Sequence, residues 1–173
     1  MAKRRVPVPH TKQIAASARA GEDPEKGSLT ASTKLSFSPD RFAGKIALIV
    51  GGAQGIGKAI ALRLAAEGAG VAIVDIDRGQ LAGTVREIKS MNGKVLGIVC
   101  DVRKRTQVDR AVARVLRTWQ RIDVLMYIAG VAKAVPFVET TDEIWDWTID
   151  VNLKGAFWFA RAVAGHMIKQ LSR

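Results

Sequence analysis

Short apolar runs alternate with longer amphipathic segments along the chain from Lys45 onward. The apolar runs predict β-strands at residues 45–50, 70–75, 95–100 and 124–128. This alternation is typical of βαβ units and a parallel sheet. Right-handed crossovers place the strands in the order 3-2-1-4, with a ligand crevice at the carboxyl ends of strands 1 and 4, where the order reverses. The predicted fold class is therefore α/β, with a doubly wound, Rossmann-like parallel sheet.

The amphipathic segments between these runs predict helices with recognisable ends. Their predicted apolar faces are Ile56, Ala59, Ile60 and Leu64 in the first helix, and Leu81, Val85 and Ile88 in the second. The first helix ends at Gly68 and the second at Gly93, since glycine readily ends helices. Thr106 and Thr140 each precede an acidic residue by three positions, a capping-box variant that predicts the starts of the next two helices. A last segment, residues 152–170, is apolar around most of its circumference and predicts a buried helix.

The first 40 residues differ in character from the rest of the chain. They show no sustained period and contain Pro7, Pro9 and Pro24, so residues 1–40 predict a disordered basic extension. A targeting or anchoring signal and a translation start assigned too far upstream are both open for it. Residues 41–173 then form one domain, and 173 residues with 48% apolar content suffice for a single core.

The formal net charge of +11 by itself raises nucleic acid or an anionic surface as a partner. The basic residues are spread along the chain. The densest group forms a stripe opposite the apolar face of the third helix: Arg110, Arg114, Arg117 and Arg121. Aromatic residues that could stack on bases are not interleaved with this basic stripe, apart from Trp119 at its end. A solvated outer face is therefore favoured over nucleic-acid binding.

Several residue types carry little predicted chemistry. The single cysteine, Cys100, ends an apolar run and predicts a buried, inert thiol and a reducing cytoplasmic location. No apolar stretch reaches the roughly 20 residues that span a bilayer, so a soluble protein without a membrane partner is predicted. His10 and His166 have no ligand cluster around them, so no metal site is predicted. Trp145 and Trp147 are interpreted as packing residues on different sides of a helix.

A glycine-rich turn, GGAQGIG, lies between the first apolar run and the first helical segment. Its glycines Gly51, Gly55 and Gly57 have the spacing G-x-x-x-G-x-G. Without side chains, backbone N–H groups can approach a pyrophosphate closely, and the following helix directs its free N–H groups and positive dipole end at the same anion. The turn therefore predicts a dinucleotide-phosphate site.

An acidic residue, Asp75, ends the second predicted strand. A carboxylate at this position can accept hydrogen bonds from the adenosine ribose hydroxyls, and it would repel a 2′-phosphate. The alternative is that Asp75 or Asp77 only caps the helix that follows.

These motifs, in this order, resemble those of the short-chain dehydrogenase/reductase family over residues 42–173. The resemblance implies hydride transfer between a nicotinamide and a carbonyl or alcohol carbon. It assigns the cofactor contacts to Gly51, Gln54, Gly55, Ile56, Gly57, Asp75, Ile76, Asp101, Val102, Ala129 and Gly130. Gln54 and Ile76 stand where a basic residue favours NADP, so the resemblance implies NAD, although Arg78 lies nearby. Asp101 matches the residue that meets the adenine, but an Asp after a strand is also a common turn former.

The chain departs from the family pattern at several places. Tyr127-Ile128 stands where the family has two asparagines, and Val50 where it has a threonine. Asn152 matches the helix asparagine that supports the catalytic lysine, and a purely structural asparagine is the alternative. The family's catalytic serine and Tyr-x-x-x-Lys pair follow the helix near which this chain ends. The only tyrosine, Tyr127, is followed four positions later by Val131, so it is interpreted as a packing residue.

The leading prediction is the NAD-binding part of a short-chain oxidoreductase, incomplete after about four strands and without turnover on its own. Its substrate would be a small alcohol or carbonyl compound, and a homo-oligomer is expected only if the full-length protein is longer. The alternative is a noncatalytic nucleotide-sensing or partner-completed module, which Tyr127-Ile128 and the early end of the chain favour. Nucleic-acid binding through the basic stripe is the third hypothesis.

Overall fold

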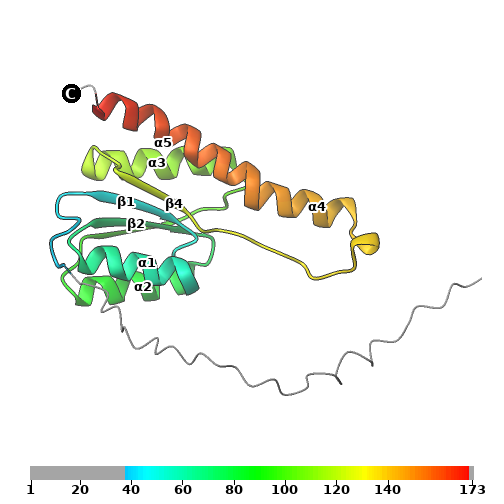
Figure 1. Cartoon of the computed structure of the whole chain (residues 1–173), viewed down its shortest axis with the longest axis horizontal. Helices are drawn as coiled ribbons and strands as arrows, with labels where there is room; N and C mark the ends of the chain where they lie inside the picture. The colour runs from blue at the N-terminus through cyan, green and yellow to red at the C-terminus, as the bar shows by residue number, and fades with distance from the viewer. Residues whose placement is uncertain (1–37, 172–173) are drawn as a thin grey trace, which may run out of the picture. The chain divides into compact units, whose positions relative to one another are not determined.

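A computed structural model describes residues 38–171 of the chain (Figure 1). Its four strands are β1 (Ile46–Val50), β2 (Gly70–Asp75), β3 (Val95–Val99) and β4 (Val124–Tyr127). Neighbouring strands pair in parallel in the order β3-β2-β1-β4. The predicted α/β class and strand order are therefore confirmed.

The predicted basic extension, residues 1–40, lies outside the described residues apart from Ser38, Pro39 and Asp40. The extension and the domain boundary placed after it stay predictions.

Helices cover both faces of the sheet, as a doubly wound fold requires. α1 (Gly55–Ala66) and α2 (Arg78–Ser90) pack on one face, while α3 (Arg105–Trp119) and α5 (Ala156–Leu171) pack on the other (Figure 1). Because the sheet is buried on both faces, its central strands β1 and β2 are apolar apart from Asp75 at the end of β2. Alternate residues of β1 enter opposite clusters, with Leu48 on the side of α3 and α5 and Ile49 on the side of α1 and α2.

The connection from β4 to α5 contains three short elements. They are a 3₁₀ turn, η1 (Phe137–Glu139), the helix α4 (Asp142–Ile149) and a π-helical segment, η2 (Asp150–Gly155). α4, η2 and α5 follow one another without a break, so together they run as one long column beside the sheet (Figure 1). π-helical segments are rare, and those that occur inside α-helices often lie near functional sites.

The predicted apolar face of α1 is right at Leu64, which is buried, and at Ile60, which is half-buried against the core, but it is wrong at Ile56 and Ala59. Ile56 is 72% exposed and Ala59 is exposed, whereas the buried residues of α1 are Gly57, Ala61, Leu64 and Ala65. Gly57 packs closely on the turn backbone at Gly51 and Gly52, and Ala61 enters the same core cluster as β1 and β2. The rotation of α1 about its axis therefore follows this close approach at its start, which leaves Ile56 outside the core. In α2, by contrast, the predicted Leu81 and Ile88 are buried.

The predicted helix caps also need correction. α3 begins at Arg105 after Lys104, so Thr106 lies inside its first turn and caps nothing. α4 is capped by Thr141 and not by Thr140, because Thr141 has the extended backbone (φ −85°, ψ 162°) of a cap and its hydroxyl accepts a hydrogen bond from the Ile144 N–H.

α5 is less buried than its composition predicted. Within the described residues it packs on α3 and β4, which covers Phe159 and Val163 fully, while Phe157 and Ile168 stay largely exposed. The predicted basic stripe lies on the exposed side of α3, although Arg121 follows the helix and pairs with Asp123. In the part of the chain that the structure describes, no helix is long and apolar enough to cross a membrane.

Candidate functional site

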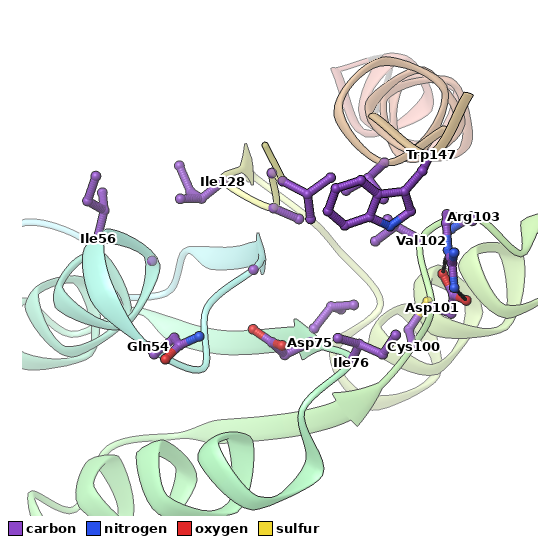
Figure 2. A pocket seen from close by; sticks show the side chains of 17 residues that line it. Gln54, Ile56, Asp75, Ile76, Cys100, Asp101, Val102, Arg103, Ile128 and Trp147 are labelled. Atoms are coloured by element: carbon purple, nitrogen blue, oxygen red, sulfur yellow. Dashed lines mark hydrogen bonds and ion pairs between the residues drawn. The ribbon is translucent and has the colours of Figure 1, made fainter. Parts of the chain in front are cut away.

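A cavity of about 520 Å³ opens at the carboxyl ends of the strands, where the strand order reverses between β1 and β4 (Figure 2). All predicted cofactor residues except Gly55 line it. These lining residues are Gly51, Gln54, Ile56, Gly57, Asp75, Ile76, Asp101, Val102, Ala129 and Gly130. The cavity has the size of ordinary small-molecule sites. Parallel strands bring these residues together because their carboxyl ends share one edge of the sheet.

The glycine turn is shaped by close backbone packing and by left-handed conformations. Gly51 has φ +81°, and a Cβ there would lie 2.5 Å from the Ala129 nitrogen. A Cβ on Gly57 would collide with the carbonyl oxygen of Gly51. Gly55 has φ +54°, but a Cβ there would meet nothing within 4 Å. Two of the glycines are therefore required by packing, whereas Gly55 leaves one side of the turn open.

The amino end of α1 offers free hydrogen-bond donors to this open side. Gln54 is the N-cap of α1, and its side chain makes no capping hydrogen bond. The first N–H groups of an α-helix have no partner within the helix, and together with the helix dipole they favour an anion. The start of α1 can therefore hold a negatively charged group beside Gln54 and Ile56.

Asp75 connects the end of β2 to the glycine turn. Its Oδ2 accepts a hydrogen bond from the Ala53 N–H at 3.0 Å, and its Oδ1 accepts one from the Asp77 N–H at 3.1 Å. Asp77, and not Asp75, caps α2, because its carboxylate accepts from the Gln80 N–H at 3.0 Å. The simple capping role is therefore ruled out for Asp75, whose carboxylate lies on the cavity wall (Figure 2).

Asp101 is held in an ion pair that the sequence did not indicate. Arg103 donates from Nε and Nη2 to the two carboxylate oxygens at 2.9 and 2.8 Å. These hydrogen bonds hold the pKa of Asp101 below its usual value. The Arg103 N–H also bonds the carboxylate at 3.0 Å, so Asp101 forms a local turn and lines the cavity at the same time.

Tyr127 packs inside the protein and does not line the cavity. Its ring lies 6.2 Å from that of Phe159, and its hydroxyl donates a hydrogen bond to the Val151 carbonyl oxygen. Burial raises the pKa of Tyr127 to about 12. The predicted packing role agrees with these contacts. The next residues, Ile128 and Ala129, are held at the cavity by hydrogen bonds from their N–H groups to Val50.

Asn152 lies in η2 and contacts Val131, which lines the cavity. Its side-chain oxygen accepts from the Val131 N–H at 2.8 Å, and its side-chain nitrogen donates to the Val131 carbonyl at 2.9 Å. Asn152 therefore ties η2 to the segment that follows β4. In the described structure Asn152 is exposed and is not among the residues that line the cavity.

Several lining residues were not predicted from the sequence. They are Val74, Cys100, Arg103, Ile128, Val131, Trp147 and Val151. Trp147 was interpreted as a packing residue, but α4 places its indole at the cavity wall opposite Asp75 and Ile76 (Figure 2). Cys100 is buried as predicted, and burial, with the neighbouring Asp101 charge, raises its pKa to about 11. Cys100 and Arg103 flank the predicted site residues Asp101 and Val102 in the sequence, so this adjacency could have identified them as lining residues. No neighbouring motif could have identified Trp147.

No group of three His, Cys, Asp or Glu residues within residues 38–171 could hold a metal ion.

The cavity combines the start of α1, which favours an anion, with two carboxylates and apolar walls. Such a cavity can take an elongated ligand with an anionic centre and hydroxyl groups that donate to Asp75.

Residues 45–172 match the family model described as short chain dehydrogenase. The chain is 42% identical over 125 residues to the (2S)-[(R)-hydroxy(phenyl)methyl]succinyl-CoA dehydrogenase subunit BbsD of Thauera aromatica, covering 72% of this chain and 50% of that protein. It is 42% identical over 130 residues to the 3-oxoacyl-[acyl-carrier-protein] reductase FabG of Thermotoga maritima, covering 75% and 53%. The chain spans about half the length of the curated relatives it matches.

Solved structures of the same family share this fold. A short-chain dehydrogenase/reductase from Burkholderia xenovorans matches with a TM-score of 0.73 and 32% identity, covering 76% of this chain and 54% of that one. The F189W actinorhodin polyketide ketoreductase with NADPH matches with a TM-score of 0.70 and 32% identity, covering 73% and 49%.

Proposed function

Because the chain belongs to the short-chain dehydrogenase/reductase family, we propose that it is the cofactor-binding part of an NAD-dependent oxidoreductase. The observation that carries this proposal is the cavity itself, where residues from the glycine turn and from the ends of β2, β3 and β4 meet. The bound nicotinamide would accept or supply a hydride at a carbonyl or alcohol carbon of a small substrate. The names of the relatives, a dehydrogenase and a reductase, favour this function over a noncatalytic module.

The residues around the cavity suit the parts of a dinucleotide. The start of α1 and Gly55 would bind the pyrophosphate through backbone N–H groups. Asp75 would accept hydrogen bonds from the adenosine ribose, and Asp101 with Val102 would contact the adenine. Ala129, whose N–H is bonded to Val50, would leave room for the rest of the cofactor beside β4.

The charges near Asp75 support NAD over NADP. A 2′-phosphate on the ribose would be repelled by the Asp75 carboxylate. Among the described residues that line the cavity, Arg103 is the only cation, and it is already paired with Asp101. Arg78, the nearby basic residue that could favour NADP, lines a separate groove with Leu81.

The chemistry on the substrate requires groups that these 173 residues do not contain. The sequence has no Tyr-x-x-x-Lys pair, and Tyr127 is unsuited to proton transfer because burial raises its pKa to about 12. We therefore expect the 173-residue chain alone to bind the cofactor without turnover. A cytoplasmic location and a small alcohol or carbonyl substrate are parts of the same proposal.

Titration of the protein with NADH and NADPH, followed by nicotinamide fluorescence, tests the proposal. NADH should bind about tenfold or more tightly than NADPH, and Asp75→Ser should reduce that preference. Asp109→Ser, an exposed acid on α3 away from the cavity, is the matched control and should change nothing. Failure of both nucleotides to bind would contradict the function. NADH formation from NAD⁺ and alcohols at the rate of an intact relative would contradict the absence of turnover.

A further inference from the structure

Ala53, in the middle of the glycine turn, is held by two side chains from elsewhere in the sequence. Its N–H donates to Asp75 Oδ2 at 3.0 Å. Its carbonyl oxygen accepts a hydrogen bond of 2.7 Å from the hydroxyl of Thr84, which lies 31 residues away on α2. Ala53 and Thr84 are each 1% exposed. Water therefore does not compete for these bonds, and the backbone of the turn is held from the strand side and from the helix side.

Thr84 has no packing reason to carry a hydroxyl. It lies between Leu81 and Ile88 on the buried face of α2, where an apolar side chain would fit the pattern. A threonine inside a helix gives up some helix propensity, and burying its hydroxyl is unfavourable unless the hydroxyl is hydrogen-bonded. The hydrogen bond to the Ala53 carbonyl satisfies that hydroxyl, so the polar side chain at this buried position is explained by its contact with the glycine turn.

The hydroxyl of Thr84 determines the direction of a neighbouring backbone donor. The carbonyl of Ala53 and the N–H of Gln54 belong to one planar trans peptide, in which the two groups point in opposite directions. Fixing the carbonyl toward α2 therefore fixes the Gln54 N–H toward the other side. Gln54 lines the cavity and is the N-cap of α1.

We propose that Thr84 is a positioning residue for the phosphate groups of the cofactor. Its hydroxyl holds the Ala53–Gln54 peptide so that backbone N–H groups at the start of α1 meet the pyrophosphate. The proposal rests on the proposed function, since it assumes that a dinucleotide occupies the cavity. It also separates the roles of two residues: Asp75 serves both the ribose and the turn, whereas Thr84 serves the turn alone.

The test compares Thr84→Val, which keeps the shape but removes the hydroxyl, with Thr84→Ser, which keeps the hydroxyl. Binding of NAD⁺ and ADP-ribose is measured by isothermal titration calorimetry, and binding of adenosine, which lacks phosphate, by NMR titration. Thr84→Val should weaken NAD⁺ and ADP-ribose about tenfold and leave adenosine within about twofold. Thr84→Ser should bind all three like the wild type. Asp75→Ala should weaken adenosine as well, which shows that the assay detects a ribose contact.

A control variant and a measurement on the unmodified protein separate positioning from general destabilisation. Leu81→Val lowers the stability of the same helix face with the hydroxyl intact, and it should leave ADP-ribose binding unchanged. NMR of the wild type should show a slowly exchanging Thr84 hydroxyl proton, whether or not Thr84→Val folds, and a rapidly exchanging one would overturn the proposal. Equal losses for all three ligands, or no loss in Thr84→Val, would overturn the proposal alone. A wild type that binds neither NAD⁺ nor ADP-ribose would overturn the proposed function and this inference with it.

Discussion

Replacing Gly57 with alanine is expected to destabilise the fold and to abolish cofactor binding together. A Cβ at this position would collide with the Gly51 carbonyl oxygen and would lie 2.9 Å from the Gly51 carbonyl carbon and the Gly52 Cα. All of these are backbone atoms, so no side-chain rotation relieves the contact. Overpacking typically costs about 1–3 kcal/mol, and we expect the upper end of that range because α1 and the turn must move apart.

Replacing Gly55 with alanine is expected to separate the two effects. A Cβ there would meet no atom within 4 Å, so the fold loses only the cost of a left-handed alanine at φ +54°, about 1–2 kcal/mol. The new methyl group would nevertheless occupy the open side of the turn, where the proposed pyrophosphate approaches. NADH affinity should therefore fall about tenfold or more.

Gly165→Ala is the matched control for both substitutions. Gly165 is exposed in α5, and a Cβ there would meet nothing within 4 Å. Alanine in an exposed helix interior should raise stability by about 0.5–1 kcal/mol without changing NADH affinity. Urea unfolding followed by circular dichroism gives the stabilities, and NADH fluorescence gives the affinities. A Gly57→Ala protein as stable as the wild type, or a Gly55→Ala protein that binds NADH normally, would refute the reasoning.

Other contacts give further expected outcomes. Arg103 lowers the folded-state pKa of Asp101. Their pair therefore stabilises the fold above the unfolded pKa of about 3.9, and this stabilisation is lost as pH falls through the lower folded pKa. The difference in free energy of unfolding between wild type and Arg103→Ala should shrink from about pH 7 to about pH 2, and a constant difference would contradict this reasoning. Tyr127→Phe leaves the Val151 carbonyl without its donor and should cost about 1 kcal/mol in urea unfolding with NADH affinity unchanged, whereas reduced affinity would show that Tyr127 also shapes the cavity. Glu67 is 1% exposed and pairs with two half-exposed arginines. Glu67→Gln should therefore lower the free energy of unfolding by about 2 kcal/mol, the size of a hydrogen bond to a charged group, and an unchanged urea midpoint would show that the pairs contribute nothing.

The elements of the fold were predictable where the sequence pattern is local. Continuous apolar runs identified the strands, and right-handed crossovers then allowed the order 3-2-1-4. The start of the apolar face of α1 was not predictable in the same way, because Ile56 contributes to the cavity while Gly57 packs on the turn backbone at Gly51. Caps were missed by one or two positions. Thr140 and Thr141 both have extended backbones, and only the folded structure shows that the hydroxyl of Thr141 accepts from the Ile144 N–H.

Some residues of the candidate site could likewise be predicted from the sequence, whereas others depend on the tertiary structure. The glycine turn, Asp75 and Asp101 could be found because each lies at or just after the carboxyl end of a strand, and the carboxyl ends of parallel strands share one edge. Trp147 could not be found, because its place at the cavity depends on how α4 and η2 run beside the sheet. Arg103 could not be assigned either, since its pairing with Asp101 depends on the side-chain conformation within the turn.

The sequence by itself determined the strands, their parallel order and the position of the glycine turn, because apolar runs and glycines act through local backbone preferences. Only the tertiary structure decided which distant side chains hold that turn and its neighbours. Thr84 reaches Ala53 across 31 residues, and Asn152 reaches Val131 across 21. Both bonds form only when the tertiary structure brings the two segments together. The Thr84 bond is buried, so the lack of competing water makes it obligatory, whereas Asn152 is exposed and its bonds serve to join two segments. No periodicity in the sequence marks the partners in advance.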